Sequence, residues 1–260
     1  MDGPTAPLVT NRRVSPSPYE GRLSLDGGAA GSVTLDVRQV RRRLPWQTRK
    51  VPPEWFDTPI VADNRRACEL IPDGSVDLVF TDPPYPDLAA YRWLGKMARR
   101  VLKPGGWLYA YTGNMSVLEA AEALARSGLD YAGMICVMGS GGFVYRFRMI
   151  GVWKPILRFT KGAATGRWMT NMNSAAPDRR YHRWGQGASP AYSAMRGTTK
   201  KGDLVLDPFC GGGTTAAVCV ALGRRFLTFD DDPEAIRVTK GRLAWADLPL
   251  FREKAPAENT

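Results

Sequence analysis

The residues best suited to chemistry stand in the stretch Thr81-Asp82-Pro83-Pro84-Tyr85, which follows an apolar run. Two consecutive prolines fix two backbone φ angles near about −65° and remove two N–H donors. Acceptor groups around this stiff corner could hold the exocyclic amino group of a flat ring, while Tyr85 stacks on the ring face. An ordinary turn at the end of a strand is the alternative, because Asp and Pro are common in such turns.

A second stretch, Asp207-Pro208-Phe209-Cys210-Gly211-Gly212-Gly213-Thr214-Thr215, joins an apolar run to a predicted helix. Gly211, Gly213 and Ala216 fit the spacing G-x-G-x-x-G/A, in which small residues let the backbone approach a ligand. Asp230 follows about 20 residues later at the end of the next predicted strand, where an acid can bind ribose hydroxyls. Asp231 and Asp232 leave the choice of that acid open by a residue or two.

Together the two motifs resemble the amino-directed DNA methyltransferases that use S-adenosylmethionine, and the resemblance covers about 61–243. The order of the motifs, catalytic first and cofactor last, is similar to the β group of that family. The resemblance implies an α/β fold with a Rossmann-like class I methyltransferase sheet that is circularly permuted, has helices on both faces and carries a small basic insert.

The same resemblance implies roles for individual residues. The catalytic residues would be Asp82, Pro83, Pro84 and Tyr85. The cofactor-binding residues would be Asp63, Asp207, Pro208, Phe209, Gly211, Gly213, Thr214, Thr215 and Asp230. Asp63 has a second interpretation as a helix N-cap, which does not exclude the first.

The elements that must position these residues follow from hydrophobic patterning. Apolar runs predict strands at 59–62, 76–81, 107–111, 131–138, 152–159, 204–206 and 225–229, and helical periodicity predicts helices at 64–71, 87–102, 116–127, 189–198, 214–222 and 233–243. This alternation predicts a mostly parallel sheet covered on both faces, with an antiparallel strand at 152–159. The run Gly139-Ser140-Gly141-Gly142 predicts a break, either a mobile loop over the substrate cleft or the tip of a disordered linker.

Positive charge is concentrated in two parts of the chain. The net charge is +11, and 139–202 alone holds 12 Lys or Arg against one acid. Such a distribution is typical of a polyanion-binding surface. We divide the chain into a basic Pro/Gly-rich arm at 1–53, a methyltransferase domain at 54–250 with a basic insert at 139–188, and a tail at 251–260. The arm either contacts phosphates or is a solvated extension.

The basic insert contains residue types that bind nucleic acids, and its position matches the target-recognition region of the resembled family. Arg and Lys pair with phosphates, and Trp or Tyr can stack on exposed bases. The candidate contacts are Arg146, Arg148, Lys154, Arg167, Trp168, Arg179, Arg180, Tyr181, Arg183 and Trp184. A surface loop whose aromatic residues pack back on the sheet is the alternative.

Cysteine usage and hydropathy exclude several classes of protein. The 4 cysteines include no CxxC pair and there is 1 histidine, which argues against a zinc site or a disulfide framework. The sequence has no signal-type opening and no apolar run long enough for a membrane span, so a cytoplasmic protein is expected.

The chemistry expected from the corner is direct methyl transfer to an amino nitrogen. Two acceptors, the Asp82 carboxylate and a backbone carbonyl such as that of Pro83, could draw the amino hydrogens out of the ring plane and free the nitrogen lone pair. Methylation at cytosine C5 would need a nucleophilic cysteine, usually in a Pro-Cys pair, and the sequence contains no such pair. The target base must leave the duplex to reach the corner.

In the resembled family, Asp at the first motif position favours adenine N6 over cytosine N4. The alternatives are cytosine N4 methylation, an RNA or protein amide N-methyltransferase, and a non-catalytic nucleic-acid-binding module. The expected partner is duplex DNA, and the resemblance also allows a homodimer and a cognate restriction enzyme.

Overall fold

The computed structural model describes residues 22–23, 35–36, 49–85, 87–144, 150–175 and 186–246, with backbone alone at 22–23, 35–36, 140–144, 150, 245 and 246. The chain divides into two compact units, Met1–Arg43 and Leu44–Thr260. In the first unit, the described residues are β1 (Arg22–Leu23) and β2 (Leu35–Asp36), which pair in antiparallel fashion. The second unit holds both motifs.

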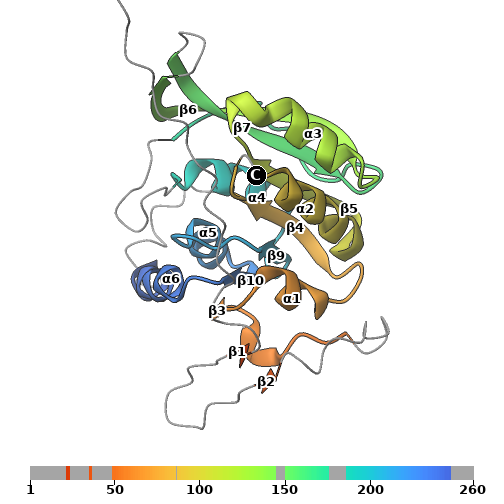
Figure 1. The fold of residues 1–260 in the computed structure, drawn as a ribbon, viewed down its shortest axis with the longest axis vertical. Helices are drawn as coiled ribbons and strands as arrows, with labels where there is room; N and C mark the ends of the chain where they lie inside the picture. Colours follow the sequence, from red (N-terminus) through yellow and green to blue (C-terminus); the bar gives the residue numbers. More distant parts are fainter. Residues whose placement is uncertain are drawn as a thin grey trace, which may run out of the picture. The chain divides into compact units, whose positions relative to one another are not determined.

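In the described part of the second unit, eight strands form one mixed sheet in the order β3-β10-β9-β4-β5-β7-β6-β8 (Figure 1). Their bounds are β3 (Pro59–Val61), β4 (Val76–Thr81), β5 (Leu102–Tyr111), β6 (Asp130–Val144), β7 (Ile150–Thr160), β8 (Met172–Ser174), β9 (Leu204–Asp207) and β10 (Arg225–Asp230). The first five strands in this order, β3, β10, β9, β4 and β5, run parallel to one another. Strand β7 is antiparallel to both β5 and β6, and β8 is parallel to β6.

The strand order confirms the predicted fold. Strands β9 and β10 come last in the chain, yet they lie between β3 and β4 in the sheet. Because the glycine-rich turn follows β9 and the proline corner follows β4, two motifs more than 120 residues apart start from adjacent strands. The sheet is therefore that of a class I methyltransferase in circularly permuted order.

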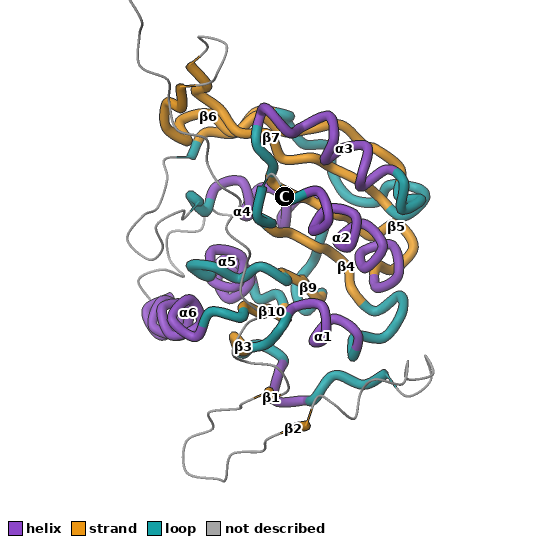
Figure 2. Tube along the Cα trace, in the orientation of Figure 1, coloured by secondary structure: helices purple, strands orange, loops and turns teal. Residues whose placement is uncertain are grey.

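Helices cover both faces of this sheet, as predicted (Figure 2). Among the described residues, the α-helices are α1 (Asn64–Glu69), α2 (Leu88–Val101), α3 (Val117–Ala125), α4 (Ser189–Thr198), α5 (Thr214–Leu222) and α6 (Pro233–Ala246), and the short 3-10 helices are η3 (Pro53–Trp55) and η4 (Asn114–Ser116). Helix α2 packs against α3, while α5 packs against both α4 and α6. In the part of the chain that the structure describes, none of the helices has the length and apolar character needed to cross a bilayer.

Local sequence explains why the strand and helix around the proline corner form. Strand β4 is buried along nearly its whole length, because helices cover both of its faces. Helix α2 begins at Asp87, whose carboxylate accepts hydrogen bonds from the backbone N–H groups of Ala89 and Ala90. Tyr91, Leu94 and the apolar residues that follow at helical spacing are buried against the sheet.

Three local predictions were wrong. The run Gly139-Ser140-Gly141-Gly142 does not end a strand, because β6 continues through it to Val144, with a register shift between Met138 and Phe143 against β7. The extra residues are accommodated as an irregularity of the ladder. Strand β5 begins at Leu102, before Lys103-Pro104-Gly105-Gly106, and a register shift against β4 accommodates this start. The sequence predicts no strand or helix between 159 and 189, yet this part of the basic insert contains the short strand β8, which pairs with β6.

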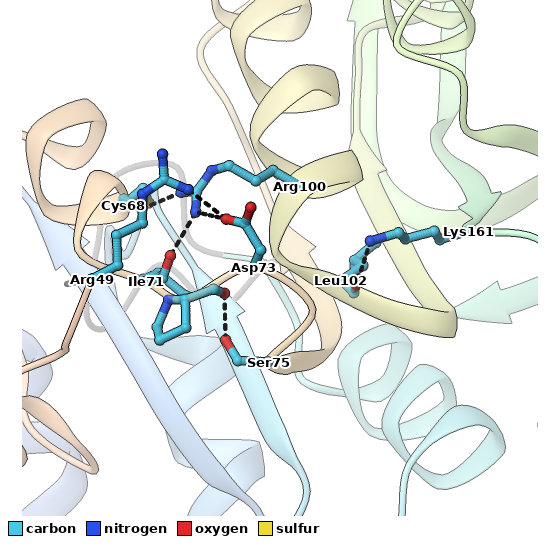
Figure 3. Close-up of polar contacts among 9 residues, drawn as sticks. Arg49, Cys68, Ile71, Asp73, Ser75, Arg100, Leu102 and Lys161 are labelled. Carbon is cyan, nitrogen blue, oxygen red and sulfur yellow. Dashed lines mark hydrogen bonds and ion pairs between the residues drawn. The ribbon is translucent and has the colours of Figure 1, made fainter. Parts of the chain in front are cut away.

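Arg100 of α2 forms hydrogen bonds with the end of α1 and with the loop between α1 and β4 (Figure 3). Its guanidinium donates to the backbone oxygens of Cys68 (2.6 Å) and Ile71 (2.6 Å), and to Asp73 Oδ1 (2.8 Å). Arg49 reaches the same Asp73 oxygen. The two guanidinium groups hold the pKa of Asp73 below its usual range, against the opposing effect of burial.

We expect Arg100→Met to lower the free energy of unfolding by about 2 kcal/mol, because it removes the donor of two carbonyl groups and a carboxylate. Urea titration of the purified variant would measure this. The matched control is Arg126→Met, since Arg126 pairs with Glu122 on the exposed face of α3 and its loss should change stability little. Equal midpoints for the two variants would contradict the role assigned to Arg100.

Candidate active site

A cavity of about 880 Å³ lies at the carboxyl ends of the central parallel strands. That edge is where open α/β sheets bind ligands. Both motifs line it. The predicted site residues on its wall are Asp82, Pro83, Pro84, Tyr85, Lys154, Asp207, Phe209, Gly211, Thr214, Thr215 and Asp230. The remaining wall is formed by Phe80, Thr81, Tyr111, Gly113, Asn114, Met115, Ser116, Gln186, Cys210, Gly212, Asp232 and Ala235.

The proline corner presents one carboxylate and one phenol to this cavity. Asp82 Oδ2 accepts a hydrogen bond from Gln186 Nε2 at 2.8 Å, and Asp82 Oδ1 is buried. Burial raises the pKa of the Tyr85 hydroxyl, and the negative charge of Asp82 raises it further. Tyr85 therefore stays a neutral phenol, with a ring available for stacking.

Lys154 of β7 brings a cation to the proline corner. Its Nζ donates to the Tyr85 hydroxyl at 3.3 Å and lies 5.8 Å from the centre of the Tyr85 ring. Strand β7 thus brings one of the predicted nucleic-acid contacts into the cavity wall.

Asp207 joins the two motifs beneath the cavity. Its Oδ1 accepts from Thr81 Oγ1 at 2.7 Å, across the boundary between β9 and β4, and from the backbone N–H of Phe209 at 3.1 Å. Burial raises the pKa of Asp207 to about 7, against the opposing effect of hydrogen bonds from Thr81 and Thr215. This residue fixes where the proline corner and the glycine turn start relative to each other.

The glycine turn has the backbone conformation that its glycines allow. Gly211 and Gly213 have φ of +50° and +70°, in the left-handed region. Gly213 precedes α5, and a Cβ atom at this position would lie 2.4 Å from Thr239 Cγ2. Gly211 faces open space instead, with nothing within 4 Å of such an atom. The turn therefore closes tightly against α6 and leaves room on the cavity side.

Asp230, at the end of β10, links the glycine turn to the segment that precedes α6. Its Oδ2 accepts from the backbone N–H of Gly211 at 2.8 Å, and its Oδ1 accepts from that of Asp232 at 3.1 Å. Burial raises the pKa of Asp230, against the effect of these two hydrogen bonds. A carboxylate has about four acceptor sites, so Asp230 can still accept from a ligand hydroxyl in the cavity.

Two residues of α6 support the glycine turn from the side away from the cavity, and sequence reasoning missed both. Thr239 Oγ1 donates to the backbone oxygen of Gly211 at 3.0 Å. Arg242, 8% exposed, donates through Nη1 to the Gly212 oxygen and to Thr214 Oγ1, both at 2.9 Å. Their interior positions on a helix about 30 residues from the turn gave no signal that could have found them.

Gln186 is a third residue that the sequence did not single out. Its side chain binds Asp82, and its backbone oxygen accepts from Thr214 Oγ1 at 3.2 Å. It lies near the end of the basic insert, just before α4, and it is neither charged nor aromatic, unlike the residue types that predict nucleic-acid contacts there.

Several predicted site residues lie elsewhere. The Asp63 carboxylate accepts from the backbone N–H of Arg66 at 2.9 Å, which makes it the N-cap of α1, and it does not line the cavity. Pro208 and Gly213 belong to the turn but are not on the cavity wall. Arg167 and Trp168 are also absent from the wall, and the backbone N–H of Arg167 donates to Gly197 near the end of α4.

Trp168 is fully exposed to solvent, so it does not pack back on the sheet as the alternative interpretation held. The other predicted nucleic-acid contacts lie outside the described residues: Arg146, Arg148, Arg179, Arg180, Tyr181, Arg183 and Trp184.

Comparison with known proteins gives the same class. Residues 191–241 match the family described as DNA methylase, N6_N4_Mtase. The type II methyltransferase M2.LlaDCHI of Lactococcus lactis subsp. cremoris is 23% identical over 236 residues, which cover 70% of this chain and 87% of that protein. The type II methyltransferase M.HpaI of Haemophilus parainfluenzae is 25% identical over 237 residues, with 72% and 74% covered.

Solved structures agree in fold. The PvuII DNA methyltransferase, described as cytosine-N4-specific, has a TM-score of 0.64 at 17% identity, with 71% of this chain and 85% of that chain covered. The M1.HpyAVI complex with SAM has a TM-score of 0.61 at 20% identity, with 72% and 98% covered. The chain is thus related to the amino-directed DNA methyltransferases, which confirms the resemblance that its two motifs carry.

Proposed function

We propose that this protein transfers a methyl group from S-adenosylmethionine to the exocyclic amino group of a flipped DNA base, with adenine N6 favoured. The single observation that carries the proposal is that the Asp82-Pro83-Pro84-Tyr85 corner and the Gly211 turn line one cavity. Its volume of about 880 Å³ falls in the range of small-molecule sites.

The residues on the turn side of the cavity fit a nucleoside cofactor. The open space above Gly211 permits close approach of a ligand to the backbone. Asp230, beside it, has acceptor capacity for ribose hydroxyls. Phe209 supplies an apolar wall, and its ring packs edge-on against Trp93 of α2, with ring centres 5.9 Å apart. When bound, S-adenosylmethionine supplies an electrophilic methyl group on sulfur.

The residues on the corner side fit a planar amine. Asp82 would accept one hydrogen of the target amino group, and a carbonyl such as that of Pro83 would accept the other. Both contacts favour the geometry in which the nitrogen lone pair leaves the ring π-system. Tyr85, held neutral by burial and by the charge of Asp82, would stack on the base. The new N–C bond would replace the methyl–sulfur bond of the cofactor, and Asp82 would accept the proton that the methylated amine loses.

DNA is favoured as substrate by charge as well as by family resemblance. The basic insert at 139–188 would contact phosphates, and Lys154 offers a cation at the cavity wall itself. Asp82 at the first motif position favours adenine over cytosine. A homodimer and a cognate restriction enzyme remain proposals that follow from the family alone.

The test is incorporation of labelled methyl groups from S-adenosylmethionine into unmethylated bacterial DNA, total RNA and protein, each assayed separately. Digestion of the DNA to nucleosides and mass spectrometry would then identify the base. We expect label in DNA as N6-methyladenine. Label in DNA as N4-methylcytosine would show that the target base is cytosine and not adenine. Label confined to RNA or protein would refute the proposal.

Asp230→Ala should weaken S-adenosylmethionine binding about tenfold, because it removes both a ribose acceptor and the acceptor that holds the Gly211 N–H. Isothermal titration calorimetry measures the dissociation constant. Asp231→Ala, a change at the exposed neighbour, is the matched control and should bind normally. Unchanged affinity in Asp230→Ala, with weakened affinity in Asp231→Ala or Asp232→Ala, would move the ribose role to that neighbour.

A further inference from the structure

Gln186 is hydrogen-bonded to Asp82, the residue that would accept from the target amine in the proposed reaction. Its Nε2 lies 2.8 Å from Asp82 Oδ2, and the residue lines the cavity. A glutamine amide and the exocyclic amino group of adenine or cytosine are both planar nitrogen donors with two hydrogens. The Gln186 amide therefore presents to Asp82 the same kind of donor that a target base would present.

An entering base cannot use the other carboxylate oxygen of Asp82, Oδ1, in place of Oδ2. Asp82 Oδ1 is buried, and Asp82 also contributes to the environment that raises the pKa of Tyr85. An incoming amine can reach the carboxylate only at the oxygen that Gln186 holds. The target base and the Gln186 side chain are then directed to the same oxygen, Oδ2, where the Gln186 amide already stands on the cavity wall.

The backbone of Gln186 is held independently of its side chain. Its carbonyl oxygen accepts from Thr214 Oγ1 at 3.2 Å, and that hydroxyl in turn accepts from Arg242 Nη1 at 2.9 Å. Because the link to the glycine turn runs through the backbone, the side-chain amide can leave Asp82 without breaking it. Rotation of side-chain torsions is a small and fast movement compared with movement of a loop.

We propose that Gln186 is a displaceable surrogate for the target amine, which satisfies Asp82 until a base enters and then yields Oδ2 to it. The inference rests on the proposed function. It has a direct consequence for kinetics, since a base that must break an existing hydrogen bond to a charged group binds more weakly than it would without a competitor. Gln186 thus raises KM for DNA and leaves the chemical step alone.

The experiment compares wild type with Gln186→Met, which keeps the length of the side chain without its donor, and with Gln186→Ala. Ser189→Ala is the matched control, because Ser189 is three residues away and its hydroxyl bonds Asn173 instead of the cavity. We expect both Gln186 variants to lower KM for unmethylated bacterial DNA about tenfold, and so to raise kcat/KM. Calorimetry with S-adenosylmethionine checks that the cofactor site is intact in each variant.

A fall in kcat at unchanged KM in both Gln186 variants would overturn the inference, because it would mean that Gln186 stays in place and orients Asp82. Unchanged kinetics would overturn it as well. A wild-type protein that methylates no DNA would instead refute the proposed function itself.

A measurement on the wild-type protein is independent of how the variants fold. The side-chain amide resonances of Gln186, assigned by their loss in Gln186→Met, should shift when DNA and S-adenosylhomocysteine are added together. Resonances that do not move, under conditions in which the DNA is bound, would overturn the inference.

Discussion

Asp82→Ala is expected to reduce methyl transfer about 10³-fold, the largest effect on activity of any single substitution in this protein. In the proposed reaction this carboxylate accepts from the target amine, and among the described residues it is the only carboxylate of the proline corner that lines the cavity. S-adenosylmethionine should still bind, since the turn-side contacts through Gly211 and Asp230 are intact. Initial rates with labelled cofactor and a calorimetric dissociation constant measure the two quantities.

A matched control separates the loss of this carboxylate from the loss of a charge nearby. Asp87→Asn changes the exposed N-cap of α2, five residues away and outside the cavity wall, and Asn is an equally good cap. It should retain activity. If Asp82→Ala kept full activity, or if Asp87→Asn lost as much, the proline corner would not be the catalytic element.

Gly213→Ala is expected to have the second largest effect, on both stability and cofactor affinity. The residue has φ +70°, and its Cβ would lie 2.4 Å from Thr239 Cγ2 and 2.6 Å from Thr239 Oγ1. Thr239 would have to move, although its hydroxyl holds the Gly211 oxygen. We expect a loss of about 3 kcal/mol in the free energy of unfolding, from strain and overpacking together. The S-adenosylmethionine dissociation constant should rise at least about tenfold.

Gly74→Ala is a control that isolates the clash from the backbone strain. Gly74 has φ +63°, close to that of Gly213, but nothing lies within 4 Å of its Cβ position. Its substitution should cost about 1 kcal/mol in urea titration and leave cofactor affinity unchanged. Equal costs for the two substitutions would show that contact with Thr239 does not shape the glycine turn.

Sequence patterning predicted the elements of this fold well where periodicity and end signals agreed. Strand β4 and helices α4 and α5 have the predicted bounds, because their buried runs end at strong signals such as Asp82-Pro83 and Gly223. Two of the three wrong predictions concern glycine-rich segments. Glycines at 105–106 and 139–142 sit inside strands at points where the ladder register shifts, and composition cannot distinguish such an irregularity from a turn.

The candidate site was predictable to the extent that it consists of two local motifs. What the sequence could not provide is the support that comes from other elements. Thr239 and Arg242 reach the glycine turn from α6, and Gln186 reaches Asp82 from 104 residues away. None of these three residues belongs to a spacing pattern, since their roles depend on tertiary contact alone. Asp63 is the opposite case. The family resemblance implies that it binds the cofactor, but in the structure its side chain caps helix α1.

The most direct test of the central claim, that the two motifs serve one reaction in one cavity, is a crystal structure with S-adenosylhomocysteine bound. We predict that the ribose lies at Asp230 and that the sulfur points across the cavity toward Asp82, leaving a gap lined by Tyr85 for a base. A ligand bound at the glycine turn with its sulfur directed away from Asp82, or a cavity with no space left beside Tyr85, would contradict the account.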